Sequence, residues 1–286
     1  MFPFLRTRRQ SVKLFKNRQS AFLMASPYIA WAVIFIVVPL AMVIYYGVTD
    51  NSGALTFENI ARISESGYLK ALYRSILLAF ISTLICFLLA YPLGMILSSM
   101  KLTRNTYLVT LFILPMWMNF LLRTLTWMTL LEGKGVINTI LEFLHLPTIN
   151  IINTSGAIVL GMVYNFLPFM ILPIYNSLSR IDDNIINAAR DLGADSLQTF
   201  LRITLPLSVP GIISGITMVF IPALTTFAIS TMLGGSKILL IGNIIEQQFT
   251  QVYDWHLGSG LSIVLMIFIL LNMIIESVSD KEGGIF

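Results

Sequence analysis

The sequence predicts an all-α, polytopic membrane protein with six transmembrane helices. Apolar residues make up 56% of its 286 residues and charged residues only 11%, and the mean hydropathy is +0.83. Ordinary soluble domains carry about 25% charged residues. The few charges are gathered between six uncharged runs, and most of these runs exceed the roughly 20 residues that a helix needs to cross a bilayer.

A basic segment precedes the first predicted span. Residues 1–18 contain six Lys or Arg and no acidic residue, whereas residues 19–49 contain no charge. A cleaved secretory signal has a short apolar core that ends at a cleavage site with small residues. The uncharged run here is long enough to span a bilayer. We therefore expect a retained helix over residues 27–48.

Five further uncharged runs predict the other spans, and they are residues 75–100, 105–122, 143–179, 203–236 and 255–275. We extend the run that begins at 105 to Leu131, across one charged residue. The next span is expected to begin near Ala157, because the stretch before it is rich in Asn, Ser and Thr. The run 203–236 exceeds one span, and Gly234 and Gly235 mark its predicted exit.

Basic residues divide unequally between the two sides of this topology. With the N-terminus inside, the inner segments hold 12 Lys or Arg and the outer segments hold five. Because cytoplasmic segments of membrane proteins carry the excess of positive charge, we expect both termini in the cytoplasm, at the plasma membrane of a prokaryote. The predicted organisation is a basic cytoplasmic segment (1–26), a six-helix transmembrane domain (27–278) and a short tail (279–286).

Three stretches on the predicted outer side have some structure of their own. Residues 57–72 place apolar and charged residues at helical spacing and predict an amphipathic helix. Residues 135–144 predict a second, shorter one. Residues 234–258 form the longest predicted outer loop, and its part near 238–245 is apolar enough to lie in the membrane interface or to dip inward.

The segment 179–211 mixes both charge signs with helix punctuation and lies between two uncharged runs. Asp182 can cap a short helix that runs through Leu192 and carries apolar residues on one face. Gly193 follows at the position where helices commonly end on a residue in the left-handed conformation. This pattern predicts a short helix that begins and ends within the segment.

A second short helix is expected directly after the first. Asp195 can cap it, with Gln198 three residues later in the capping-box position. Its apolar stripe includes Phe200, and Pro206 is expected to end it. Two short helices at an angle between two spans form a projection that a soluble partner could grip. The alternative is an ordinary amphipathic hairpin at the membrane interface.

Small residues, glycine and apolar residues recur at fixed spacing in this segment, at Ala188-Ala189, Gly193-Ala194, Phe200, Ile203 and Leu205-Pro206. The pattern resembles the EAA loop of ABC-importer permeases over about twenty residues, although the Glu of the motif is replaced here by Asn187. The resemblance implies the type I ABC-importer permease fold and a first helix that docks on a cytoplasmic ATPase. The residues that it assigns to this coupling are Asp182, Asn187, Ala188, Ala189, Asp191, Gly193, Ala194, Phe200 and Pro206.

The predicted third span carries a charged residue. Asn119, Arg123 and Trp127 are four residues apart and are expected to share one face of a helix. A charge that faces lipid costs at least a few kcal/mol, so Arg123 marks a candidate functional site. It could line a passage or hold a gate. Equally, it could reach the outer interface or pair with Glu132 or with a helix C-terminus.

The resemblance extends beyond the 179–211 segment. It includes Leu114-Pro115-Met116-Trp117, Leu122-Arg123-Thr124, Gly135-Val136-Ile137-Asn138, Leu167-Pro168-Phe169-Met170, Pro173-Ile174-Tyr175 and Leu240-Ile241-Gly242-Asn243. These stretches are similar to the polyamine (spermidine/putrescine) branch of the permeases, which typically has Tyr-Ala where this chain has Leu125 and Thr126. The likeness covers most of the chain from Tyr91 to Asp254. Because a bare Arg repels a polycation, Arg123 is expected to act as scaffold or gate.

Aromatic, polar and acidic residues suggest a passage for a cation. Trp and Tyr rings attract alkylammonium groups through cation–π contacts, although such residues also serve helix packing and interfacial belts. Glu246 and Asp254 flank the long outer loop and could draw cations toward it. The candidate pathway residues are Trp117, Asn119, Arg123, Trp127, Tyr164, Asn165, Tyr175, Thr225, Glu246 and Asp254.

The chain contains no catalytic motif that we recognise: no HExxH, no Walker lysine loop and no GxSxG. The two histidines lie far apart, and the single Cys86 lies in a predicted span, so no metal site is expected. The resemblance therefore implies a non-catalytic subunit that binds no cofactor itself. ATP and Mg would be used by a separate ATPase.

The partners that the resemblance implies are two copies of that ATPase, a second related permease chain and an extracytoplasmic polyamine-binding protein, with the lipid bilayer around the chain and no nucleic acid. One alternative is a permease for another small solute, such as an opine or an organic cation. An alternative from a different class is an ATP-independent membrane scaffold or an intramembrane enzyme.

Overall fold

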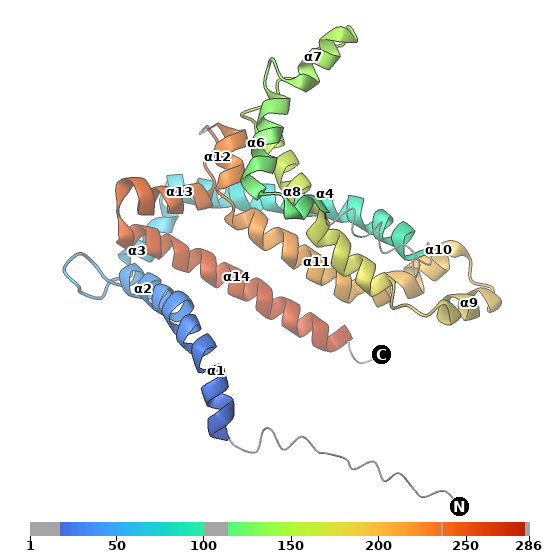
Figure 1. Cartoon of the computed structure of the whole chain (residues 1–286), viewed down its shortest axis with the longest axis horizontal. Coiled ribbons are helices and arrows are strands. Elements are labelled where there is room, and N and C mark those ends of the chain that lie inside the picture. The colour runs from blue at the N-terminus through green and yellow to red at the C-terminus, as the bar shows by residue number, and fades with distance from the viewer. Residues whose placement is uncertain (1–17, 100–113, 236, 284–286) are drawn as a thin grey trace, which may run out of the picture.

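The computed structural model describes residues 18–99, 114–235 and 237–283. Within these ranges the chain forms helices and turns, together with one isolated antiparallel bridge between Thr49 and Leu55. The long helices lie roughly side by side, and two shorter ones, α6 and α7, leave the bundle at a steep angle (Figure 1). The predicted all-α fold class is confirmed.

Five helices in the described ranges are long and apolar enough to cross a membrane. The first, Ala25–Gly47, joins α1 (Arg18–Ala32), a π-helical turn η2 (Val33–Val37) and α2 (Val38–Gly47). The other four are α4 (Ser66–Ser99), α8 (Ser155–Leu178), the helix Ser196–Thr225, and Trp255–Ile274 within α14 (Trp255–Gly283). They agree with five of the six predicted spans.

The predicted third span differs in its described part. Its first residues, 105–113, lie outside the described ranges. A 3-10 turn η5 (Leu114–Trp117) precedes α6 (Phe120–Leu131), and the Asn119 side chain caps α6 by accepting the Leu121 N–H at 2.8 Å. The expectation that Asn119 shares a helical face with Arg123 is therefore wrong. Asn competes for backbone N–H groups and so favours a helix start over a helix interior.

The centre of the bundle is the crossing of α8 and α11 (Leu205–Thr225) beside α4, and its closest approaches lie at glycines. A Cβ atom on Gly211 would lie 2.6 Å from the Pro173 carbonyl oxygen, and one on Gly215 would lie 2.7 Å from the Met170 sulfur. Small residues at helix crossings let two backbones approach closely in a membrane, where no hydrophobic force drives helices together. The nearly inaccessible side chains of the core include Ile158, Met162, Met170, Ile171, Ile174 and Val219.

At one end of the bundle, the 179–211 segment forms α9 (Asp183–Asp191), α10 (Ser196–Thr199) and a π-helical turn η6 (Phe200–Thr204). The prediction that Pro206 ends the second helix is wrong, because one continuous helix runs from Ser196 to Thr225. The Leu205 N–H donates to the Phe200 carbonyl five residues back. This wide turn makes room for the proline ring, which in a regular α-helix clashes with the carbonyl four residues earlier.

The fifth span ends earlier than predicted. Thr226 is extended, with ψ 135°, so α11 stops at Thr225, and the glycines 234–235 instead end a separate helix, α12 (Ala228–Gly234). The break is stabilised because Asn243 donates from Nδ2 to the Phe227 carbonyl at 3.1 Å. The same carbonyl accepts the Thr231 N–H at 2.9 Å, so the Asn243 amide ties α13 to the residue at which α12 begins.

The stretch predicted as a long outer loop, 234–258, is largely helical in its described residues. It forms α13 (Ile241–Gln247) and a π-helical turn η7 (Gln248–Val252). Leu240 and Ile241 are fully buried, so this stretch dips inward, as one of the two predicted alternatives had it.

The two predicted amphipathic pieces fare differently. The shorter one is confirmed as α7 (Val136–Phe143). The other, 57–72, is not one helix: it consists of α3 (Glu58–Ala61), a 3-10 turn η3 (Arg62–Ser64) and the start of α4. Glu65 is extended between them, with ψ 140°, and this conformation interrupts the helix.

We predict that Gly211→Ala destabilises the protein, because the added Cβ would strike the α8 backbone at Pro173. Overpacking of this kind costs about 1–3 kcal/mol. Gly67→Ala is the matched control: Gly67 also lies in a helix, α4, but a Cβ there meets nothing within 4 Å. Melting temperatures in detergent should fall for Gly211→Ala and stay or rise for Gly67→Ala. Equal melting temperatures would contradict the close crossing.

Candidate functional site

The first short helix of the 179–211 segment begins and ends as predicted. The Asp182 side chain accepts the Asn184 N–H at 2.9 Å, which caps α9. Gly193 has φ +86°, and its N–H and that of Ala194 donate to the carbonyls of Arg190 and Ala189, at 2.9 and 3.0 Å. This pair of bonds is a Schellman motif, which requires the left-handed conformation that glycine adopts most easily.

The second short helix begins with the predicted capping box. The Asp195 carboxylate accepts the Gln198 N–H at 2.7 Å, and the Gln198 side chain accepts the Asp195 N–H at 3.3 Å. Because these caps satisfy the backbone locally, the angle between α9 and α10 is determined within the segment itself. Phe200, at the start of the π-turn, is half-buried, whereas Pro206 is exposed.

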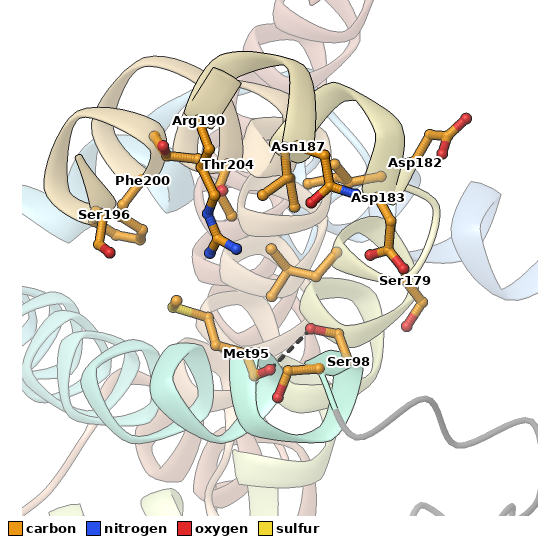
Figure 2. Close-up of a pocket in the computed structure, with 15 residues that line it drawn as sticks. Met95, Ser98, Ser179, Asp182, Asp183, Asn187, Arg190, Ser196, Phe200 and Thr204 are labelled. Atoms are coloured by element: carbon orange, nitrogen blue, oxygen red, sulfur yellow. Dashed lines mark hydrogen bonds between the residues drawn. The ribbon is translucent and has the colours of Figure 1, made fainter. Parts of the chain in front are cut away.

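Two faces of α9 have different surroundings. Its inward residues, including Asn187 and Arg190, line a cavity of about 710 Å³ between the 179–211 segment and the end of α4 at Met95 and Ser98. Figure 2 shows the Arg190 guanidinium pointing into this cavity.

The outward side of the 179–211 segment is apolar and exposed. Ile185 on α9 and Leu197 on α10 are exposed, and Leu192 is 89% exposed. Ala188 is exposed and Ala189 is half-buried, while Asp191 and Ala194 stand at the turn between the helices. A cluster of exposed apolar side chains with small residues between them is typical of a surface that another protein covers.

An aromatic contact joins this segment to α4, and sequence analysis did not identify it. The Tyr91 ring meets the Phe200 ring edge-on, with centroids 5.9 Å apart, and its hydroxyl lies 3.0 Å from the Ser208 hydroxyl. Tyr91 is buried, so the start of α11 is held to α4 by both packing and a hydrogen bond. Only its aromatic character and its place in a span could have indicated Tyr91.

A second group of candidates lies between α6 and α8. Arg123 is 7% exposed, and its Nε and Nη1 have no hydrogen-bond partner among the described residues. Asn165 is 1% exposed and donates to the Gly161 carbonyl at 2.9 Å and to the Thr124 hydroxyl at 3.4 Å. Trp127 on α6 packs edge-on against Tyr164 on α8, and their ring centroids are 5.3 Å apart. Arg123 is therefore buried within the protein, between α6 and its neighbours.

A third group lies at the other end of α11. Thr225 and Glu246 line a groove of about 510 Å³ between α11, α13 and α14. Glu246 Oε1 accepts the Thr250 hydroxyl at 2.9 Å. The groove is otherwise largely apolar, and the side chains that line it include Phe227, Ile245, Phe249, Leu265, Met266 and Ile269. One carboxylate in an aromatic and aliphatic groove suits an ammonium group on an alkyl chain.

The remaining candidates are not brought to this groove. Asp254 caps α14 by accepting the Leu257 N–H at 2.9 Å, and it lines a different cavity of about 470 Å³. Trp117 is 83% exposed beside the start of α6. Tyr175 lies ten residues beyond Asn165 on α8, about 15 Å along the helix. The ten candidates thus occupy several separate places.

Sequence reasoning also missed a polar network that supports the groove. Asn243 accepts the Ser230 hydroxyl at 2.6 Å and donates to the Thr231 hydroxyl at 2.8 Å, and both partners lie on α12. Ser75 of α4 accepts the Ile241 N–H at 2.8 Å. The only sequence signal was the stretch 240–243, which stood out as part of a resemblance and not for its chemistry. Among the described residues, no three His, Cys, Asp or Glu side chains gather as metal ligands would.

Residues 90–280 match the model of the family described as "binding-protein-dependent transport system inner membrane component". The chain is 35% identical over 261 residues to the spermidine/putrescine transport system permease protein PotB of Haemophilus influenzae, which covers 88% of this chain and 91% of that protein. It is 37% identical over 255 residues to PotB of Escherichia coli, which covers 86% and 93% of the two chains.

A solved structure gives the same fold. A chain of a bacterial alginate ABC transporter, solved with an alginate-bound periplasmic protein, superposes with a TM-score of 0.76 at 16% identity, over 93% of this chain and 96% of that one. At this identity the likeness concerns the fold alone. The match to the family model covers more than half of the chain, and it includes α8, the 179–211 segment, α11 and the groove. The chain therefore belongs to the family of binding-protein-dependent transport system inner membrane components.

Proposed function

We propose that this chain is a permease subunit of an ATP-binding-cassette importer that carries polyamines of the spermidine and putrescine type. The observation that supports the substrate most strongly is the identity of 35–37% to permeases named for spermidine/putrescine transport, over most of both chains. The chain itself is a non-catalytic membrane subunit. It binds no cofactor, and ATP with Mg is used by a separate ATPase.

The groove at Glu246 agrees with this substrate class. A polyamine alternates ammonium groups with short methylene chains. Glu246 offers one carboxylate, Phe227 and Phe249 offer ring faces, and the α14 wall at Leu265 and Met266 is apolar. Carboxylates and aromatic rings attract ammonium groups, while the apolar wall accommodates the methylenes. In this proposal Arg123, which is buried and does not line the groove, acts as scaffold or gate.

The proposed partners are a second, related permease chain, two copies of a cytoplasmic ATPase and an extracytoplasmic polyamine-binding protein. The first span, Ala25–Gly47, supports the second permease chain: its apolar window contains no buried residue, and it packs on α14 through α2, so most of its surface is open to lipid or to another chain. The exposed apolar residues of the 179–211 segment, with Leu192 foremost, form the proposed ATPase contact.

The proposed mechanism is alternating access. ATP binding closes the ATPase dimer, α9 moves with it, and the motion reaches α8 and α11, which the 179–211 segment connects. The orientation that this requires, with both termini and the 179–211 segment in the cytoplasm, follows the count of 12 inner against five outer basic residues.

The orientation can be tested with single cysteines in a Cys86→Ala background. A membrane-impermeant maleimide added to intact cells should label Ser52→Cys, which lies in the exposed turn after the first span. It should label Ser196→Cys, at the start of α10, only after the membrane is permeabilised. Labelling of Ser196→Cys in intact cells would reverse the topology.

We expect Gly193→Val to abolish transport while the ATPase stays bound. Valine at φ +86° is strained by about 1–3 kcal/mol, and no neighbouring atom lies within 4 Å of the added Cβ, so the effect comes from the backbone alone. The strain would change the direction of α9 relative to the ATPase. The measurements are uptake and ATPase activity of the whole complex in proteoliposomes, with ATPase retention followed by pull-down.

Two variants control for this effect. Gly193→Asn should transport nearly as the original chain does, because Asn tolerates the left-handed conformation. Gly53→Val introduces the same kind of strain at φ +82°, also with no atom within 4 Å, but in the turn after the first span. It should leave coupling intact. Normal transport by Gly193→Val with the ATPase bound would refute the coupling role.

We expect Glu246→Gln to lower polyamine uptake at low substrate concentration by about tenfold, the loss that corresponds to one charge-assisted hydrogen bond. The defect should be larger at low ionic strength, where screening is weakest. Glu142→Gln is the control, since Glu142 is exposed on α7, away from the groove. Uptake by Glu246→Gln that equals that of Glu142→Gln at both salt concentrations would remove Glu246 from the pathway.

A further inference from the structure

A small basic pocket lies on the side of α13 away from the Glu246 groove. Lys70 and Arg74, in the first turns of α4, and Lys237, which precedes α13, line a cavity of about 330 Å³. The α13 end lies beside the start of α4 (Figure 1). Three of only five basic residues in the predicted outer segments thus gather in one place, from parts of the chain more than 160 positions apart.

The charges in this pocket are uncompensated. No Asp or Glu is among the described residues that line it. In the part of the chain that the structure describes, Arg62 and Glu65 form an ion pair, whereas Lys70, Arg74 and Lys237 form neither an ion pair nor a side-chain hydrogen bond. Arg74 is half-buried. The other polar residues of the lining, Tyr68, Gln247 and Gln248, carry hydrogen-bond donors. A concave site with several donors and positive charges suits a phosphate group.

The position of the pocket relative to the membrane indicates where the phosphate comes from. The 34 residues of α4 measure about 51 Å, whereas the hydrocarbon core is about 30 Å thick. The sequence has no charge from 75 to 99, so residues 66–74 project out of the hydrocarbon. Arg74 then stands at the level of the lipid headgroups, and Lys70 lies about 6 Å higher.

The surface below the pocket suits acyl chains. Leu77, Leu84 and Leu88 follow Arg74 at helical spacing, and all three are exposed. A headgroup in the pocket would therefore continue into an apolar face of α4. A polycationic substrate, in contrast, is repelled by three positive charges, so the pocket does not belong to the proposed pathway.

We propose that this pocket binds the phosphate of an anionic phospholipid, such as phosphatidylglycerol, in the outer leaflet of the membrane. Basic residues near a membrane surface each attract anionic lipid by about 1 kcal/mol. The choice of the outer leaflet rests on the proposed function, because the orientation of the chain is part of that proposal. The assignment of the pocket as a phosphate-binding site rests on three observations: the three basic residues, the absence of acidic residues from the lining, and the exposed leucines that follow on α4.

The test compares Lys70→Gln, Arg74→Gln and Lys237→Gln, singly and together, with Lys134→Gln, an outer basic residue at the exposed turn between α6 and α7. The complex is reconstituted in nanodiscs of phosphatidylcholine alone or mixed with phosphatidylglycerol. Native mass spectrometry then counts retained lipid, and melting temperature reports stabilisation. We expect phosphatidylglycerol retention to fall on the order of fivefold per cation removed, and Lys134→Gln to behave as the original chain.

Three results would overturn the proposal. The first is equal phosphatidylglycerol retention by the triple variant and by Lys134→Gln. The second is full stabilisation by soluble glycerol 3-phosphate, which would assign the pocket to a free anion. The third is a loss of binding-protein-stimulated ATP hydrolysis by the triple variant in pure phosphatidylcholine, where the original chain retains it, which would make the pocket a protein-docking site. Polyamine uptake in that same lipid tests the proposed function separately, because lipid retention does not depend on transport.

Discussion

Two glycines of α11 lie directly on the backbone of α8, and this crossing holds the centre of the bundle. At Gly211 no side chain separates α11 from the Pro173 carbonyl, and at Gly215 the neighbour is Met170. The 179–211 segment connects these same two helices. Under the proposed mechanism, a displacement of α9 would act on two helices that pack closely at these glycines. The Tyr91 contacts with Phe200 and Ser208 extend this rigid unit to α4.

The features that the sequence predicted best are those whose cause is local. Asp182 and Asp195 cap their helices, and Gly193 adopts a positive φ, because each of these conformations is determined by hydrogen bonds within six residues. The prediction that Asn119 lies within a helix was wrong for a local reason as well. Its tendency to cap a helix competed with the apolar periodicity of a span, and Asn119 became the N-cap of α6. The prediction that Pro206 ends a helix was wrong because a π-turn lets the helix continue across the proline. The residue pattern that we used does not indicate such a turn.

The groove could not be predicted as a site, although two of its residues were candidates. Thr225 and Glu246 are more than 20 positions apart, and they meet because α13 folds back against α11 and α14. That return depends on Asn243, which bonds to Phe227 and to side chains of α12. The same fold places positive charges on the far side of α13, at Lys70 and Lys237. One short helix therefore separates a groove that contains the Glu246 carboxylate from a pocket lined by three basic residues.

The π-turn at Phe200–Thr204 also bears on how the short helices can move. A π-turn accommodates one residue more than an α-helical turn, and each residue of an α-helix corresponds to a rotation of about 100°. Conversion of this turn to α-helical geometry would twist α10 about the axis of α11 by roughly that angle, while the glycine crossing below stays in place. The turn also precedes Pro206, whose missing N–H leaves one fewer hydrogen bond to break. The π-turn therefore gives the 179–211 segment a point at which rotation, and not only tilting, is geometrically available.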